Sequence, residues 1–324
     1  MTIKLGVIGA GAIAPYHLDA FQALNVSFFG IAASNGSTRA KKLGQRYDFS
    51  NVFYSWQELV KRSEEFDALL LCTPPTISEM VLKSVLPFKN RILVEKPVTL
   101  SLESIDSLLA KDCSNVSVAF NRRYYESVIE FKKSVKNQSG HISALIIEDF
   151  PRDMENIRKS LFENSIHVFD LLNFILGPIS LSNIQNLNTP KGATGNILND
   201  NGEYIGDFKI KFGSPENSEI LFSTDDSSFL LKPIENFSRF NSLICLEPTR
   251  ERPIRAYTPH WSGEEKNSIY VNTDFKPGFF EQAREFVSQE PTLERKLCTM
   301  GEAKRATMLA DIIYKSITSE MQIK

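Results

Sequence analysis

The chain has 324 residues, enough for two domains that each bury a core of their own. Its formal charge of -2 and pI near 6.2 give no electrostatic reason to expect nucleic acid or an anionic membrane as a partner. No apolar stretch reaches the roughly 18 residues of a membrane span, and the start of the chain lacks a secretory signal pattern. The four cysteines lack metal-binding spacing, so we expect no metal site and a reducing, cytoplasmic location.

The first third of the chain alternates short apolar runs with segments of helical period, which is typical of strand-helix-strand units and a parallel sheet. The predicted strands are residues 3–8, 26–33, 66–72, 91–94 and 117–120. The predicted helices are residues 14–24, 37–47, 55–61, 77–86 and 101–109. Thr99 or Ser101 can cap the last of these helices. The pattern predicts a doubly wound α/β domain of the Rossmann type over residues 1–121.

The pattern changes from about residue 122. A predicted helix over residues 124–135 leads into predicted strands at residues 142–148, 207–212, 219–223, 229–233, 243–247 and 269–272. Asn164 can cap a helix that Gly177-Pro178 stop, and two helices at residues 278–287 and 301–318 close the chain. Turn signals such as Asp200-Asn201-Gly202 favour antiparallel pairing. Residues 122–324 are therefore predicted to form an α+β domain with an open-faced, mostly antiparallel sheet.

A glycine turn follows the first predicted strand directly. Gly9 permits a tight turn, Gly11 lets the backbone approach a pyrophosphate, and Ala14 is small enough for close helix packing. Pro15 fits the first helical turn, which has no use for an N–H at that position. An ordinary strand-helix turn is the alternative, but the position between strand and helix favours a dinucleotide site.

The second predicted strand ends without the acidic residue that usually binds the ribose 2'-hydroxyl of NAD. Ser34 stands there, and Arg39 follows five residues later. A hydroxyl and a guanidinium can bind a 2'-phosphate, so we favour NADP(H), with NAD(H) possible. Alternatively, Arg39 belongs to a solvated helix face together with Lys41 and Lys42.

Glu95-Lys96-Pro97 follows the predicted strand at residues 91–94, which places one lysine at the carboxyl edge of the sheet. Oxidation of a secondary alcohol needs a group that removes the hydroxyl proton as hydride leaves carbon. A lysine partly removed from water beside a cationic ring releases its proton more readily, and the ammonium donates in the reverse direction. A surface lysine paired with Glu95 is the alternative.

Five motifs, in this order and spacing, resemble the glucose-fructose oxidoreductase and inositol dehydrogenase (Gfo/Idh/MocA) family. They are Gly9-Ala-Gly11-Ala-Ile-Ala14 with His17, Thr73-Pro74-Pro75, Glu95-Lys96-Pro97, Asn121-Arg122-Arg123-Tyr124 and His167-Val-Phe-Asp170. The closing segments at residues 279–286 and 303–316 are similar more weakly. The resemblance implies a Rossmann domain followed by an open-faced α+β domain, with the substrate between them.

The resemblance also implies roles for individual residues. Lys96 is expected to carry the proton, and His167, steadied by Glu163 or Asp170, to hold the reacting oxygen. The expected cofactor-binding residues are Gly9, Gly11, Ala12, Ile13, Ser34, Arg39, Cys72, Thr73, Pro74, Glu95, Lys96, Asn121 and Arg123.

The chain departs from the family pattern just before His167. Where the family commonly has Asp-x-Gly-x-His, this chain has Glu163-Asn-Ser165-Ile-His167. The longer carboxylate is expected to shift the histidine, and the Ser165 side chain to narrow the approach to the nicotinamide. The preceding cations Arg152, Arg158 and Lys159 are expected to meet an anionic substrate group or to be a solvated charged loop.

The sequence therefore predicts an NAD(P)-dependent oxidoreductase that interconverts a secondary hydroxyl and a ketone on a sugar, cyclitol or nucleotide-sugar. A non-catalytic NADP-binding sensor or complex subunit is the alternative, and reduction of an imine or enone on the same scaffold is a third reading. Exposed strands at residues 220–222 and 230–231 predict a homodimer or homotetramer formed through the second sheet.

Overall fold

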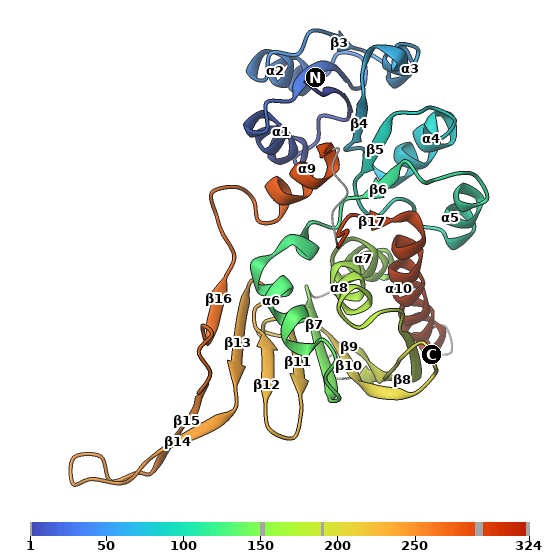
Figure 1. The fold of residues 1–324 in the computed structure, drawn as a ribbon. Coiled ribbons are helices and arrows are strands. Elements are labelled where there is room, and N and C mark those ends of the chain that lie inside the picture. Colours follow the sequence, from blue (N-terminus) through green and yellow to red (C-terminus); the bar gives the residue numbers. More distant parts are fainter. Residues whose placement is uncertain (1, 150–152, 189–190, 289–293, 322–324) are drawn as a thin grey trace. The chain divides into compact units, whose positions relative to one another are not determined.

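The chain folds into two compact units in a computed structural model that describes residues 2–149, 153–188, 191–288 and 294–321 (Figure 1). Unit 1 comprises Met1–Tyr124 and Thr273–Met308, and unit 2 comprises Tyr125–Asn272 and Leu309–Lys324. Both units are discontinuous, whereas the predicted domains 1–121 and 122–324 were continuous. The difference arises because a late segment of the chain packs with the first domain.

Unit 1 contains a seven-stranded sheet with strand order β17-β6-β5-β4-β1-β2-β3. Its strands are β1 (Lys4–Ile8), β2 (Ser27–Ala32), β3 (Val52–Phe53), β4 (Ala68–Leu71), β5 (Arg91–Val94), β6 (Val116–Val118) and β17 (Cys298–Thr299). All pair in parallel except β17, which is antiparallel to β6. The order from β3 to β6 is that of a Rossmann sheet, so the predicted fold of the first domain is confirmed.

Five helices connect these strands as predicted, with small changes at their ends. They are α1 (Ala14–Ala23), α2 (Thr38–Arg46), α3 (Trp56–Val60), α4 (Pro75–Val85) and α5 (Leu102–Leu109). The Ser101 hydroxyl caps α5 by accepting a hydrogen bond from the Ser104 N–H, as predicted. Strands β1 and β4 are almost wholly buried, which explains why their sequences are continuous apolar runs.

The carboxyl ends of the parallel strands lie level with one another. Ile8 at the end of β1 pairs with Ala32 of β2 on one side and with Leu71 of β4 on the other. Leu71 in turn pairs with Val94, the last residue of β5. The loops that follow these four strands therefore meet at one edge of the sheet, where ligands bind in open α/β folds.

Helix α9 (Phe279–Val287) belongs to unit 1 and packs against α1. Phe279, Ala283 and Phe286 join the same apolar core as strands β1 and β4. The Arg91 guanidinium donates to the carbonyls of Phe286 and Ser288 at 2.9 and 2.8 Å, where a cation complements the helix C-terminus. The family resemblance predicted the helix but not its place in the first unit.

Unit 2 contains an eight-stranded sheet with strand order β16-β13-β12-β11-β7-β10-β9-β8 (Figure 1). Its strands are β7 (His141–Glu148), β8 (Ser180–Asn188), β9 (Lys191–Leu198), β10 (Tyr204–Phe212), β11 (Glu219–Ser223), β12 (Ser228–Leu231), β13 (Asn236–Phe240) and β16 (Ser268–Tyr270). Of the described strands of this sheet, only β7 and β10 pair in parallel with each other, so the mostly antiparallel sheet is confirmed. A separate two-stranded ribbon is formed by β14 (Ser242–Leu246) and β15 (Ala256–His260).

The helices of unit 2 are α6 (Glu126–Val135), α7 (Met154–Ser160), α8 (Ile166–Leu176) and the last part of α10 (Met300–Met321). Buried and half-buried residues alternate along the central strands β7, β10, β11 and β12, as expected for a sheet with one covered face. This alternation corrects the prediction that residues 220–222 and 230–231 are exposed along their whole length. Ile220, Phe222 and Leu231 are buried on the covered face, and only Leu221 and Leu230 face the open side.

The start of α8 also differs from the prediction. The chain enters this helix through a π-helical turn, Leu161–Ser165, and Asn164 does not cap it. The Asn164 amide instead donates to the Glu148 carboxylate at 3.3 Å. The predicted stop is confirmed, because Gly177 ends the helix with φ of +86°.

Candidate active site

The turn after β1 has no room for a side chain at its first glycine. Gly9 has φ of +106°, and a Cβ there would lie 2.3 Å from the backbone oxygen of Cys72. Its N–H donates to the Ala32 carbonyl at 2.9 Å, which ties the turn to the end of β2. Helix α1 begins five residues later at Ala14, with Pro15 in its first turn. The result is a bare backbone turn in front of a helix N-terminus, which suits a pyrophosphate.

A cavity of about 660 Å³ opens at this edge of the sheet, where β1, β2 and β4 end. Seven of the predicted cofactor-binding residues line it: Gly9, Gly11, Ser34, Arg39, Cys72, Thr73 and Pro74. Ala12 and Ile13 are not among its lining residues. The remaining walls come from the ends of β2 and β4, from Tyr54 and Ser55 in the loop after β3, and from Trp56 and Gln57 at the start of α3.

The described residues that line this cavity carry positive charge and no negative charge. None of its described lining residues is acidic, and Arg39 supplies a guanidinium. Ser34 and Arg39 are both exposed, and no ion pair of Arg39 occurs among the contacts described. The Ser37 hydroxyl, which also lines the cavity, accepts a hydrogen bond from the Ala40 N–H and so fixes the start of the helix that carries Arg39. The electrostatics favour an anion at the end of β2.

The turn after β4 is fixed by hydroxyl groups. The Thr73 and Ser78 hydroxyls lie 2.8 Å apart, and the Ser78 hydroxyl also donates to the Thr73 carbonyl at 3.1 Å. Ser78 is fully buried, so its hydrogen bonds fix the Thr73 turn from the interior of the domain. Burial and the nearby Glu95 charge hold the pKa of the Cys72 thiol well above its ordinary range. A thiolate is therefore disfavoured, and Cys72 contributes backbone and bulk to the cavity wall.

A buried hydrogen-bond chain positions the turn that carries Lys96. His17 Nε2 lies 2.6 Å from Glu95 Oε1, and Glu95 Oε2 accepts the Lys96 N–H at 3.1 Å. The His17 side chain is only 1% exposed, and its ring packs 4.6 Å from the ring of Phe279 in α9. The Glu95 N–H also donates to the Leu71 carbonyl at 2.9 Å. Lys96 is thus presented at the carboxyl edge, one strand away from the Thr73 turn.

Asn121 and Arg123 make structural contacts and do not line the cavity. The Asn121 amide donates to the Pro277 carbonyl at 2.9 Å. Arg123 is 1% exposed, and its guanidinium donates to Glu302 at 3.1 Å and to the Lys296 carbonyl at 3.3 Å. Both residues therefore attach the returning segment at residues 273–308 to the Rossmann sheet.

We expect Arg123→Met to lower the free energy of unfolding by about 3 kcal/mol, because it leaves the half-buried Glu302 carboxylate without its buried cation. Burial raises the pKa of Glu302, while the Arg123 guanidinium and hydrogen bonds from Thr299 lower it, and its net pKa lies below the ordinary value of 4.5. The stability from this pair is therefore present above about pH 4.5 and lost as the pH falls through the folded-state pKa. Urea unfolding at several pH values should show the gap between wild type and variant narrowing in acid.

Cofactor affinity separates this structural role from the predicted binding role. Arg123→Met is expected to change the NADP⁺ dissociation constant less than about threefold when measured well below the melting temperature. A loss of about tenfold or more in NADP⁺ affinity, with stability unchanged, would mean that Arg123 binds the cofactor directly.

The remaining predicted catalytic residues belong to unit 2. Glu163 lies half-buried in the π-helical turn, whereas His167 and Asp170 are buried in the first turns of α8. Single-turn π-helices occur often at functional sites. Lys96 belongs to unit 1, so its pairing with His167 stays a prediction.

The departure from the family pattern at Ser165 has a structural explanation. Ser165 is 1% exposed, and its hydroxyl donates to Glu148 Oε1 at 2.5 Å. Glu148, the last residue of β7, is buried and also accepts from Asn164. The Ser165 side chain is thus directed to the end of β7, where it fixes the π-helical turn two residues before His167.

The cations preceding this turn have different environments. Arg152 lies outside the described residues. The Arg158 guanidinium lies 5.6 Å from the ring of Phe162 and 5.8 Å from that of Tyr314, and Lys159 is exposed.

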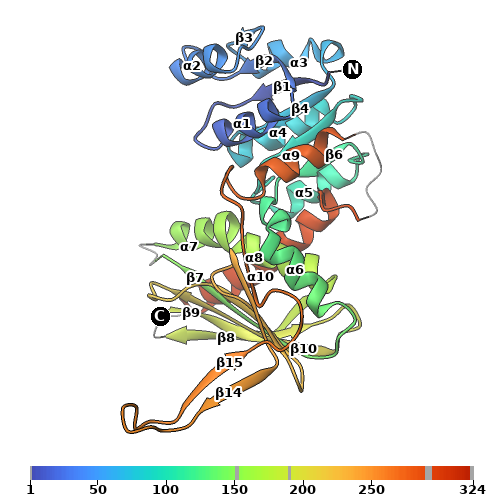
Figure 2. The same cartoon turned by 60° about the vertical axis from the view of Figure 1, so that its left-hand side comes forward.

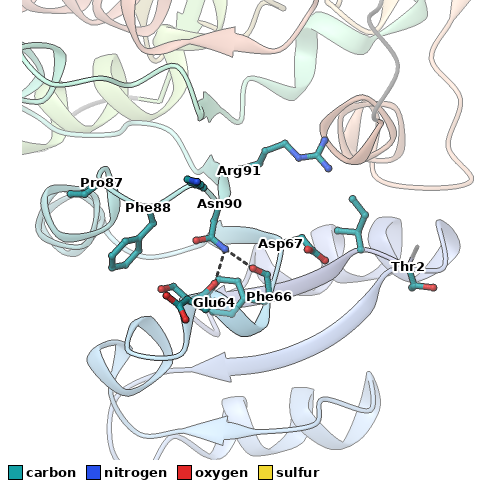
Figure 3. Close-up of a pocket in the computed structure, with 11 residues that line it drawn as sticks. Thr2, Glu64, Phe66, Asp67, Pro87, Phe88, Asn90 and Arg91 are labelled. Atoms are coloured by element: carbon teal, nitrogen blue, oxygen red, sulfur yellow. Dashed lines mark hydrogen bonds between the residues drawn. The ribbon is translucent and has the colours of Figure 1, made fainter.

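A second cavity, of about 670 Å³, lies at the opposite edge of the unit 1 sheet (Figure 3). It is lined by Thr2, Glu64, Phe66, Asp67 and Arg91, among others. Its polar groups already serve the fold: the Asn90 amide donates to the Ser63 and Phe66 carbonyls, and Arg91 holds the end of α9. Because cofactors of this fold bind at the carboxyl ends of the strands, the first cavity is the candidate site.

Two features of the site were not predicted. The Tyr54–Gln57 wall follows β3, a strand of only two residues that periodicity cannot detect. The sequence motif gives His17 no role of its own, because its partner Glu95 is 78 residues away in the sequence. The placement of a histidine in the first turns of a helix after a glycine turn was the available signal.

No helix in the described part of the chain is long and apolar enough to cross a membrane. Within the same residues, no group of three or more His, Cys, Asp or Glu side chains is placed to hold a metal ion.

A Rossmann domain whose glycine turn leads into a helix N-terminus has the architecture of a dinucleotide-binding protein. Residues 3–120 match the Gfo/Idh/MocA family, described as an oxidoreductase family with an NAD-binding Rossmann fold. The recognition of this family from the motifs is thereby confirmed over residues 3–120, and the relatives that the chain resembles are named as oxidoreductases and dehydrogenases.

Individual relatives agree with this assignment. The chain is 22% identical to the uncharacterized oxidoreductase YrbE of Bacillus subtilis (strain 168), over 99% of this chain and 96% of that protein. It is 24% identical to the myo-inositol 2-dehydrogenase of Thermotoga maritima, over 54% of this chain and 55% of that enzyme. The UDP-N-acetylglucosamine 3-dehydrogenase GnnA of Acidithiobacillus ferrooxidans superposes with a TM-score of 0.73 at 16% identity, covering 99% of both chains. At this identity the structural likeness shows the fold alone.

Proposed function

We propose that the chain is an NADP(H)-dependent oxidoreductase that interconverts a secondary hydroxyl and a ketone on a sugar, cyclitol or nucleotide-sugar. The observation that carries the proposal is the edge of the unit 1 sheet. There a glycine turn, a cavity without acidic lining and the turn of Lys96 lie at the ends of adjacent strands. The substrate class is supported by relatives named as dehydrogenases of myo-inositol and of glucose 6-phosphate.

The residues present fit a dinucleotide. The Gly9 turn has space for backbone only, so a pyrophosphate would meet N–H groups and the start of α1 without a side chain in the way. The Thr73 turn and the end of β2 would form the walls, and Ser34 with Arg39 would hold a 2'-phosphate. When bound, the nicotinamide supplies the hydride acceptor or donor.

In the direction of oxidation, Lys96 Nζ would accept the substrate hydroxyl proton while the carbinol carbon loses hydride. The His17–Glu95 pair would fix the backbone of the lysine turn, so that Nζ samples few positions. His167 would donate a hydrogen bond to the same substrate oxygen, with Glu163 or Asp170 orienting the imidazole. In the direction of reduction, Lys96 would return the proton to the oxygen.

Turnover assays with NADP⁺ over a panel of sugars, cyclitols and UDP-sugars test the proposal through the change in nicotinamide absorbance. Turnover of at least one of these substrates, abolished by Lys96→Met, is the expected result. Cofactor binding without turnover anywhere in the panel would favour a sensor or complex subunit. Activity on planar imines or enones alone would favour the third reading.

We expect Arg39→Ala to raise the NADP⁺ dissociation constant by about 10- to 100-fold, because a charge-assisted hydrogen bond to a 2'-phosphate is lost. NAD⁺ lacks this phosphate, so its dissociation constant should change less than about threefold. Titration calorimetry with both cofactors measures the effect. Lys42→Ala, an exposed cation of the same helix that does not line the cavity, is the matched control. Equal losses for both cofactors would contradict the NADP preference.

Self-association through the open face of the unit 2 sheet is part of the proposal. Leu145, Leu221 and Leu230 lie half-buried on adjacent strands of this face, with Leu221 directly opposite Leu230. A face of this kind is commonly covered by a symmetric partner. A homodimer or homotetramer is the expected state.

A further inference from the structure

The β14–β15 ribbon and its tip, residues 241–260, form an arm that is exposed along its whole length. Every residue of β14 is exposed, as are four of the five residues of β15. Both views show it extending from unit 2 beyond the end of β13 (Figures 1 and 2). An isolated two-stranded hairpin is marginally stable in water, and its unpaired edges are open to further pairing.

The base of the arm is anchored to the buried side of the unit 2 sheet. The arm begins just after the last residue of β13, and the Asn241 N–H donates to the His260 carbonyl at 3.0 Å. The Trp261 ring lies 6.5 Å from the Phe229 ring, and the buried Arg239 guanidinium lies 5.3 Å from Trp261. Arg239 is held in turn by Glu130 of α6 at 2.6 Å. The arm therefore leaves the sheet in a direction that packing defines.

Both faces of the arm carry apolar side chains. In the antiparallel register Leu243 and Cys245 share one face with Pro259 and Tyr257, because residues opposite each other point to the same side. Ile244 and Leu246 lie on the other face. The exposed fractions of Leu243 and Tyr257 are 64% and 59%, and Ile244 and Leu246 are each 42% exposed. An apolar surface of this extent marks a protein interaction site.

We propose that the arm packs against unit 2 of a second copy of this chain, and that the two copies exchange arms. Each face of five strand pairs offers on the order of 170 Å², so one arm covered on both faces buries about 350 Å². This falls short of the roughly 600 to 1,000 Å² per partner of a standard interface. A second copy that gives and receives an arm doubles the area to about 700 Å² per partner, which lies within that range.

Charge complementarity also favours a second copy. The tip of the arm carries three exposed or half-exposed arginines, Arg250, Arg252 and Arg255. Arg255 is paired with Glu247 at 2.7 Å within the arm, so Arg250 and Arg252 outnumber the remaining carboxylate, Glu251. The exposed turns between β9 and β10 and between β11 and β12 carry Asp200, Glu203, Asp225 and Asp226. These acidic turns lie at one end of the sheet, since His141 at the start of β7 pairs with Ser223 and contacts Tyr204. One chain therefore supplies both signs of charge.

The inference goes beyond the proposed pairing of open sheet faces, and it does not depend on hydride transfer. Sedimentation velocity of the full chain tests it. Wild type is expected to have at least twice the 36.6 kDa mass of one chain. Two double variants each change one face of the arm. The first combines Leu243→Lys with Tyr257→Lys, and the second combines Ile244→Lys with Leu246→Lys. Each pair is expected to raise the dissociation constant about 100-fold.

Met80→Lys is the matched control, because Met80 is 50% exposed on α4 of unit 1, whereas the arm belongs to unit 2. It should keep the wild-type mass. Unchanged thermal unfolding at matched oligomeric state shows that the arm variants fold, which is expected because the arm lies outside the core. A photo-crosslinking residue at position 257 should give covalent dimers whose linked peptide comes from unit 2 of the other copy.

Other outcomes would overturn the inference. A wild-type chain that sediments as a 36.6 kDa monomer would rule out both arm exchange and pairing through the open sheet face. If Leu221→Lys dissociates the assembly while the arm pairs keep wild-type mass, sheet pairing stands and arm exchange fails. Dissociation by Met80→Lys to the same degree would also count against the arm.

Discussion

Replacement of Lys96 by methionine is expected to lower kcat/KM by about 10³-fold, within the range of a positioned proton carrier. The reason is that the substrate oxygen would have no base to take its proton as hydride leaves. The NADP⁺ dissociation constant should change less than about threefold, because the glycine turn and the 2'-phosphate site are untouched. Steady-state kinetics and cofactor titration on the same preparation measure both quantities.

Lys96→Arg distinguishes proton transfer from simple charge. Arginine keeps the positive charge but does not give up its proton in proteins, so this variant should be nearly as inactive as the methionine variant. Lys111→Met, an exposed lysine of the same unit, is the control and should retain wild-type rates. Recovery of activity in Lys96→Arg would mean that only the charge matters.

His167→Asn is expected to lower kcat by about 100-fold, since the imidazole is proposed to hold the reacting oxygen. Cofactor affinity should be nearly unchanged, because His167 belongs to unit 2 and the dinucleotide cavity is lined by unit 1. The pH dependence of kcat adds a readout that packing alone would not move: the limb that reports the histidine should vanish in the variant.

The exposed histidine of the same unit provides the comparison for His167. His141→Asn removes an imidazole that contacts Asp207 and Tyr204 at the sheet edge, and it should leave kcat and its pH profile unchanged. If His167→Asn keeps the wild-type pH profile and loses activity only in proportion to stability, the histidine would be a packing residue.

The Rossmann half of the fold could be predicted from sequence because its signals are local. Buried parallel strands read as apolar runs, and the glycine turn stands next to the strand it ends. Seven predicted cofactor residues meet at one cavity because the carboxyl ends of parallel strands necessarily share an edge. The family resemblance added the catalytic assignments, which sequence periodicity alone does not provide.

The parts that sequence did not predict depend on contacts between distant segments. Nothing local to Arg123 indicates that Glu302, 179 residues away, takes its guanidinium. The same holds for α9, which packs on α1 only because the chain returns to unit 1. Polar strands such as β8 (Ser180–Asn188) lack the apolar alternation that would have revealed them.

Ser165 illustrates how structure changes the meaning of a motif departure. From sequence, its side chain stood in place of a glycine and was expected to narrow the approach to the nicotinamide. In the fold the hydroxyl is bound to the buried Glu148 carboxylate. The substitution thus comes with a partner at the end of β7, and we regard the pair as the support of the π-helical turn before His167.

A crystal structure with NADP⁺ and a substrate identified from the sugar panel is the most direct measurement of the central claim. The account predicts Lys96 Nζ within about 3 Å of the substrate oxygen, with C4 of the nicotinamide beside the carbinol carbon. A ternary complex in which this amine faces bulk water, with another group at the oxygen, would contradict it.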